Sequence, residues 1–151
     1  MAVGAFTFYN MGKQYISGTI NLGSTNFSAH LYTSASNFAT ATLSTLAGLT
    51  NEVASGNGYK LSGKALTTVT WGAGTSAAQK KFTSSAFLWT ATGGTIASIK
   101  GLVLVAQTGA SAKASTNKLL CFCTLTTAQF TLASANTLTI TPSATGIFTL
   151  V

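Results

Sequence analysis

The sequence Ile99-Lys100-Gly101-Leu102-Val103-Leu104-Val105 ends in four consecutive large aliphatic residues. It is too short to cross a membrane as a helix, which needs about 20 apolar residues. Its β-branched residues and the nearby glycines favour a strand that is covered on both faces. A second apolar run, Lys118–Leu125, follows across the polar stretch Gly109–Asn117. Two such runs joined by a polar loop predict an antiparallel strand pair at the centre of an all-β domain.

Outside this pair the chain shows shorter apolar patterns that are separated by turn residues. In residues 4–16 the spacing of Phe8, Met11, Tyr15 and Ile16 indicates one face of a helix. We therefore expect an N-terminal helix or arm over residues 1–18 and a single domain over residues 19–151, a β-sandwich or jelly roll of about eight strands. The further strands are expected at Thr19–Leu22, Phe27–Thr33, Tyr59–Trp71, Lys81–Thr90, Gln129–Leu132, Thr137–Thr141 and Gly146–Val151.

The composition indicates a protein that is packed into an assembly. Charged residues make up 6% of the 151 residues, whereas an ordinary soluble domain has about 25%. A polar but nearly uncharged surface repels neighbouring molecules weakly, because net charge is a main cause of separation in solution. A secreted β-domain rich in threonine and serine is the alternative that composition leaves open.

The net charge of +7 comes from eight lysines without any arginine, and Glu52 is the single acidic residue. The lysines are scattered, and only Lys80 and Lys81 are adjacent. Nucleic-acid-binding proteins usually cluster their basic residues and use arginine for bidentate contacts. We therefore predict no nucleic-acid partner and a weak, salt-sensitive attraction to an acidic protein surface. The sequence also lacks the pattern of a signal peptide or membrane span, so we expect synthesis in a cytoplasm and no membrane partner.

The scarcity of acidic residues argues against most hydrolytic chemistry. Glycosidases normally use two carboxylates, and a serine–histidine–acid triad needs an acid that only Glu52 could supply to His30. Calcium and magnesium sites need several carboxylate oxygens. Cys121 and Cys123 share one face of their strand and are expected to be buried, unreactive thiols. We predict no enzyme activity, no catalytic residue, no cofactor and no metal site.

Several short motifs together resemble a family of small structural proteins from tailed bacteriophages. These motifs are Asn51–Val53, the turn Gly56–Tyr59, the strand Gly63–Leu66 and the closing segment Gly146–Leu150. The resemblance implies a virion component, namely a head decoration (cement) protein on the outer capsid surface. Its implied partners are the major capsid protein and further copies of itself in a homotrimer. The chain departs from the family pattern in lacking the several aspartate and glutamate residues of such proteins.

The surfaces expected to make capsid or subunit contacts are residues 1–18 and the loop 34–50. The adjacent lysines Lys80 and Lys81 are further candidates. Glu52 is another, since its carboxylate could bond locally or to a lysine across an interface. The candidate contact residues are Phe6, Phe8, Tyr9, Lys13, Phe38, Leu43, Leu46, Glu52, Lys80 and Lys81.

A tail, receptor-binding or carbohydrate-binding virion module is the alternative function. Tyr59, Trp71 and Trp89 could form a stacking platform for sugars. Aromatic residues on strands more often lie in the core, so this alternative requires an exposed row of rings.

Overall fold

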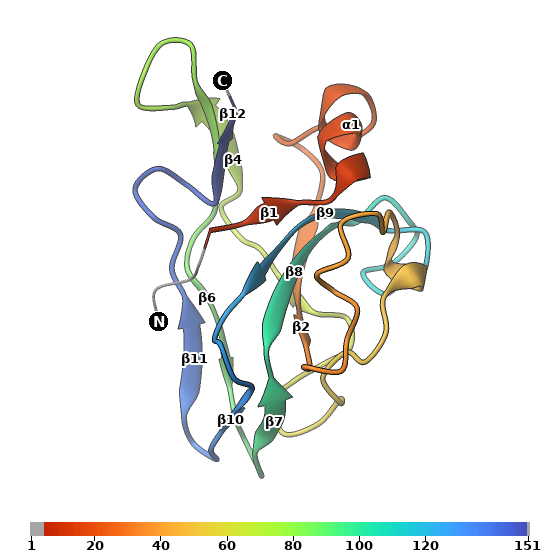
Figure 1. Ribbon diagram of the computed structural model, residues 1–151. Coiled ribbons are helices and arrows are strands. Elements are labelled where there is room, and N and C mark those ends of the chain that lie inside the picture. The colour runs from red at the N-terminus through yellow and green to blue at the C-terminus, as the bar shows by residue number, and fades with distance from the viewer. Residues whose placement is uncertain (1–4, 151) are drawn as a thin grey trace.

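The computed structural model describes residues 5–150, and these residues fold mostly into antiparallel β-structure with one short α-helix (Figure 1). The elements are β1 (Thr7–Phe8), α1 (Asn10–Gly18), β2 (Phe27–Tyr32), the 3-10 turn Leu46–Gly48, β3 (Lys64–Ala65), β4 (Thr70–Ala73), β5 (Lys80–Thr83), β6 (Phe87–Thr90), β7 (Ile96–Ile99), β8 (Gly101–Ala106), β9 (Lys118–Thr124), β10 (Phe130–Leu132), β11 (Thr137–Ile140) and β12 (Phe148–Leu150). No helix within residues 5–150 is long and apolar enough to span a membrane.

The predicted central strand pair is confirmed. β8 and β9 pair antiparallel, with Leu102 opposite Cys123 and Val103 opposite Phe122. They lie in a five-stranded sheet of order β1-β9-β8-β2-β3. Every residue of β8 is buried, as expected for a strand that is covered on both faces.

The apolar run 99–105 is not one strand, however, because the chain changes partners at Lys100. Ile99 ends β7, which pairs with β10, and Gly101 begins β8, which pairs with β2 and β9. Ser98, within β7, has a left-handed φ of 61° at the irregularity in the pairing of β7 with β10. The Lys100 N–H donates a hydrogen bond to the Tyr32 carbonyl, and the Lys100 carbonyl accepts one from the Leu125 N–H.

The remaining strands form three smaller antiparallel sheets, β10-β7, β11-β6 and β12-β5-β4. In Figure 1, β6 and β11 lie beside the five-stranded sheet, and β4 and β12 lie at one end of the molecule. The described residues therefore contain twelve strands, more than the eight or so expected from the sequence.

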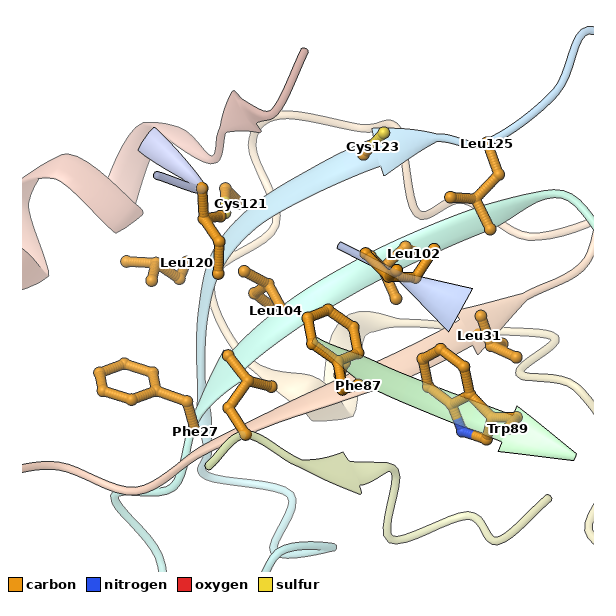
Figure 2. Packing of buried hydrophobic residues seen from close by; sticks show 14 of the residues in the cluster. Phe27, Leu31, Phe87, Trp89, Leu102, Leu104, Leu120, Cys121, Cys123 and Leu125 are labelled. Carbon is orange, nitrogen blue, oxygen red and sulfur yellow. The ribbon is translucent and has the colours of Figure 1, made fainter. Parts of the chain in front are cut away.

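Two hydrophobic clusters lie on opposite faces of the five-stranded sheet. The larger cluster receives Phe27 and Leu104 from that sheet and Phe87 and Trp89 from β6 (Figure 2). Because side chains alternate along β8, Val103 and Val105 point to the opposite face of the sheet. There the smaller cluster contains Tyr9, Tyr32, Phe38, Val103, Val105, Leu119 and Phe122, with Leu43, Leu46 and Leu49 packed against it.

The N-terminal prediction is correct in part. The helix starts at Asn10, and Thr7 and Phe8 instead form the edge strand β1, opposite Phe122 and Cys121 of β9. Backbone hydrogen bonds to an open sheet edge outweigh the helical spacing of the apolar residues here. Residues 1–4 of the predicted arm lie outside the described residues. The expected strand Thr19–Leu22 is a turn, because two successive backbone N–H groups donate to the Tyr15 carbonyl at the helix end.

Two longer predicted strands are interrupted. Tyr59–Trp71 yields only β3 and β4, because Gly63 and Thr68 adopt left-handed φ values of 68° and 51°. Lys81–Thr90 divides into β5 and β6, which pair with different partners. The buried Phe82 and Phe87 are five residues apart, so the inward-facing phase changes between β5 and β6.

Candidate functional site

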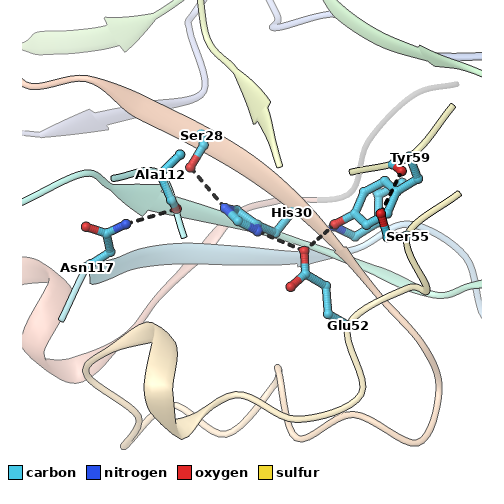
Figure 3. Close-up of polar contacts among 8 residues, drawn as sticks. Ser28, His30, Glu52, Ser55, Tyr59, Ala112 and Asn117 are labelled. Atoms are coloured by element: carbon cyan, nitrogen blue, oxygen red, sulfur yellow. Dashed lines mark hydrogen bonds and ion pairs between the residues drawn. The ribbon is translucent and has the colours of Figure 1, made fainter. Parts of the chain in front are cut away.

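The five-stranded sheet carries a buried polar network on β2. Ser28 and His30 are two residues apart and share a face, and both are fully buried. The Ser28 Oγ lies 3.0 Å from Nε2 of His30, and the His30 Nδ1 lies 3.0 Å from Oε1 of Glu52 (Figure 3). A neutral His30 with its proton on Nδ1 satisfies both contacts, since Nδ1 then donates to Glu52 and Nε2 accepts from Ser28.

Glu52 is held beside β2 by the chain's own backbone. It forms an isolated antiparallel bridge with Tyr32. Its Oε1 also accepts a 2.6 Å hydrogen bond from the Tyr59 hydroxyl, whose oxygen in turn accepts one from the Leu31 N–H at 3.0 Å. Burial, followed by the nearby Glu52 charge, raises the pKa of Tyr59 above its usual range. The single carboxylate is thus bonded locally, and within residues 5–150 it forms no ion pair with a lysine.

Ser28 contacts His30, and His30 contacts Glu52, which is the same chain of hydrogen bonds that activates the serine of a catalytic triad. The Ser28 hydroxyl and the His30 ring are 0% exposed, so a substrate has no path to either of them in this structure. No buried side-chain nitrogen or oxygen among the described residues lacks a hydrogen-bond partner. The arrangement links the turn that contains Tyr59 to β2 and thereby stabilises the fold.

A groove of about 560 Å³ lies between β1 and the segment that leads from β11 into β12. Phe6 and Phe8 line one side, and Ile147 and Phe148 line the other. The rings of Phe8 and Phe148 meet edge to face with their centroids 4.8 Å apart. The Lys81 ammonium donates a 3.3 Å hydrogen bond to a carbonyl of the same β11–β12 connection. We call this the β1–β12 groove, and two of the predicted contact residues, Phe6 and Phe8, line it.

β1 and β12 are also the outer strands of their sheets in the described part of the chain. β1 pairs only with β9, and β12 pairs only with β5. The outer edge of such a strand can pair with a strand of another chain. Lys80 is exposed on β5 and Lys13 is exposed on α1, so both remain available at the surface.

The predicted contacts in loop 34–50 occupy a different position. Tyr9 is 0% exposed and Phe38 is 4% exposed, and the Tyr9 hydroxyl donates to the Phe38 carbonyl. Leu43 and Leu46 pack against the same smaller cluster. The prediction that Tyr9 and Phe38 face a partner needs correction, because both are buried within their own chain. Leu43 and Leu46 are half-buried, and a partner contact through them stays a prediction.

The aromatic residues named for sugar stacking do not form an exposed row. Trp89 and Tyr59 are 3% and 1% exposed, and their rings lie 6.5 Å apart within the core. Trp71 is half-buried and packs against the same cluster. Two of the three rings are therefore enclosed in the core, and only Trp71 is partly exposed.

The two cysteines are buried in the core, as predicted. Burial, followed by the proximity of Cys123, raises the pKa of the Cys121 thiol well above its usual value. In residues 5–150 no three histidine, cysteine or acidic side chains gather in a group that could hold a metal ion.

Sequence reasoning predicted a strand and a family motif in the closing segment but did not name Ile147 and Phe148 as contact residues. It also left open whether Glu52 reaches His30. The shared face of Ser28 and His30 was visible from the period of the strand, but the closeness of residue 52 depends on the bridge to Tyr32.

Comparison with known proteins finds no family model, no curated protein and no solved structure that matches this chain.

Proposed function

We propose that this chain is a head decoration (cement) protein of a tailed bacteriophage, which binds the major capsid protein on the outer capsid surface and stabilises the lattice. The observation that carries the proposal is the β1–β12 groove. One wall comes from the N-terminal segment expected to make contacts, and the other comes from the motif Gly146–Leu150 that carries the bacteriophage resemblance.

The chemistry of the groove suits adhesion to another protein. Its walls are apolar and aromatic, and two outer strands of separate sheets border it. An extended segment of a capsid protein could place an apolar side chain against Phe6 and pair its backbone with a strand edge. The small share of charged residues, 6%, favours close packing, because few ionised groups would lose their hydration in the contact.

The proposed architecture is a β-sandwich or jelly roll that assembles as a homotrimer. The support for two packed layers is the shared cluster between the five-stranded sheet and β6, through Leu104, Phe87 and Trp89. A trimer would present three grooves to a repeating lattice. Simultaneous contacts raise the overall affinity without any single strong interaction.

Cryo-electron microscopy of virions produced from the genome that encodes this chain tests the proposal directly. The expected result is density for this fold at regular positions on the outer face of the capsid, with the β1–β12 groove against the major capsid protein. Density confined to the tail would support the alternative virion module. Particles without this chain would overturn the assignment to a virion.

A binding assay supplies a second test. Recombinant protein is mixed with purified heads that lack it, and bound protein is measured after sedimentation. The proposal predicts that binding saturates and that decorated heads disassemble at a higher temperature than undecorated heads. A protein that remains in the supernatant at all concentrations would contradict it.

A further inference from the structure

A second groove, of about 390 Å³, lies where β3 and the preceding turn approach β6. We call it the lysine groove. Its lining combines two ammonium groups, one exposed leucine, hydroxyl groups and glycine backbone. The residues are Gly58, Lys60, Gly63, Lys64, Leu88, Trp89, Thr90 and Thr92.

The two lysines of this groove have no partner within the described residues. Lys60 and Lys64 are exposed, and neither ammonium forms an ion pair or hydrogen bond in residues 5–150. Lys81, Lys100 and Lys118 differ, since the first two donate to backbone carbonyls and the third lies over the Tyr15 ring. Two unpaired positive charges in one groove attract a carboxylate-bearing ligand.

The same groove contains an exposed apolar side chain. Along β6 the alternation directs Phe87 and Trp89 inward and leaves Leu88 outward. Leu88 is 41% exposed and is the large hydrophobic residue that stands out at the surface of the described chain. A ligand that covers it gains from burying apolar area, which favours a peptide over a phosphate backbone.

The walls of the groove are held by backbone packing. Gly58 has a φ of 93°, and a Cβ atom there would lie 2.0 Å from the Thr90 carbonyl oxygen. Gly63 has a φ of 68°, and a Cβ atom there would lie 2.7 Å from the Ala29 carbonyl oxygen. These two glycines allow the segment that carries Lys60 and Lys64 to pack directly against β6 and β2, so the lysines and Leu88 are presented from a fixed frame.

We propose that the lysine groove binds an acidic segment of a partner protein, in which carboxylates flank an apolar side chain. The carboxylates would pair with Lys60 and Lys64, and the apolar side chain would cover Leu88. A second copy of this chain cannot supply that segment, since its one acid is Glu52, already bonded to His30 and Tyr59. The inference deepens the proposed function and rests on it only for the identity of the partner.

Peptide binding tests the inference without a capsid. The probe is the fluorescein-labelled peptide acetyl-SDELEDS-amide, and its amide counterpart acetyl-SNQLQNS-amide is the control. Fluorescence anisotropy is measured with the intact protein at low salt and again at about 1 M salt, where the Debye length is about 3 Å. We expect the acidic peptide to bind at low salt and to be released at high salt. The amide peptide should not bind at either salt concentration.

Matched variants locate the site. The double variant K60Q/K64Q is expected to weaken binding of the acidic peptide about fivefold, from two partly exposed ion pairs. The control K13Q/K113Q removes the same charge at exposed lysines outside the groove and should change binding less than about twofold. Circular dichroism and gel filtration verify that both variants fold. Leu88→Ser should weaken binding of the acidic peptide about threefold by removing the apolar contact.

The inference is overturned if both double variants lose binding equally, since net charge alone would then explain the attraction. It is also overturned if the acidic peptide does not bind, or if a 20-base-pair DNA duplex binds at least as tightly and with the same dependence on Lys60 and Lys64.

Sedimentation with purified heads separates this inference from the proposed function. If the wild-type protein and K60Q/K64Q decorate heads equally, the lysine groove is not a capsid contact although the proposed function stands. If neither the wild-type protein nor K60Q/K64Q binds heads, the proposed function fails. If the acidic peptide still binds through Lys60 and Lys64 in that case, the inference that the lysine groove binds an acidic protein segment stands.

Discussion

The N-terminal segment and the loop 34–50 carry similar apolar residues, yet the structure uses them in opposite ways. Phe6 and Phe8 line an open groove at the edge of two sheets. Phe38 and its neighbouring leucines lie over the outer face of the five-stranded sheet and enclose Tyr9. The difference teaches that apolar residues in an irregular segment first satisfy any uncovered sheet face of their own chain. Phe6 and Phe8, at the outer strand β1, instead stay half-buried in a groove that a partner could enter.

The largest expected effect comes from Phe38→Ala. This side chain is 4% exposed, and its ring occupies the space above Gly101. Removing it should lower the free energy of unfolding by about 3–5 kcal/mol, because a cavity opens in the smaller cluster. Urea denaturation gives the value, and Phe6→Ala, at a half-buried position in the β1–β12 groove, is the matched control. Equal losses in the two variants would erase the distinction between the covering loop and the groove.

A smaller loss is expected from Glu52→Ala. The change leaves His30 and Tyr59 without their shared acceptor, and an unsatisfied buried donor costs about 1–3 kcal/mol. Urea denaturation again measures the loss. Occupancy on purified heads should not change beyond what the lower stability explains. A variant with wild-type stability and poor occupancy would instead assign Glu52 to the interface.

The loss of stability at alkaline pH tests the burial of tyrosines in both hydrophobic clusters. Burial is the main cause that raises the pKa values of Tyr9, Tyr32 and Tyr59 above their usual range, so the folded chain keeps its phenol protons after the unfolded chain begins to lose them near pH 10. Stability should therefore be fully present below about pH 10 and should fall as pH rises further, by about 1.4 kcal/mol per pH unit for each such tyrosine.

The decline can be followed by urea denaturation between pH 8 and pH 11. Tyr59→Phe lowers stability at neutral pH by removing a hydrogen bond, but it should make the alkaline decline less steep. An unchanged slope in this variant would mean that Tyr59 does not contribute to the linkage.

The smallest expected effect on stability belongs to Phe6→Ser. A half-buried groove residue should contribute no more than about 1 kcal/mol to the free energy of unfolding. Its affinity for heads should fall about tenfold, equivalent to about 1.4 kcal/mol. Sedimentation with purified heads measures the change, and Lys113→Gln on an exposed loop is the control. Unaltered binding would remove Phe6 from the proposed contact and leave the groove without its principal support.

Much of the sheet could be predicted because its signals are local. Alternation placed Phe27 and Leu31 on one face of β2, and the two central apolar runs identified β8 and β9 as a pair. The positive φ values of the Gly56–Gly58 turn were also foreseeable from its glycine and asparagine residues. The left-handed φ of Gly63 is a local feature that glycine permits, whereas the separate partners of β5 and β6 could not be foreseen, because they depend on strands far away in the chain.

The contact predictions show the same limit. The apolar character of Tyr9, Phe38 and Phe6 is equal evidence for a core and for an interface when only the sequence is known. Which of them is covered depends on where loop 34–50 crosses the sheet, and no local pattern encodes that path. The lysine groove is a further case, because Lys60 and Leu88 become neighbours only when β3 approaches β6.

The sequence by itself determined a mostly β chain with few charged residues, its central strand pair and the scarcity of acids, because composition and alternation are properties of neighbouring residues. The tertiary structure alone decided that Glu52 reaches His30, that loop 34–50 covers the smaller cluster and that the β1–β12 groove and the lysine groove stay open. Those outcomes depend on contacts between residues far apart in the chain, where burial of apolar surface and satisfaction of buried polar groups are settled jointly.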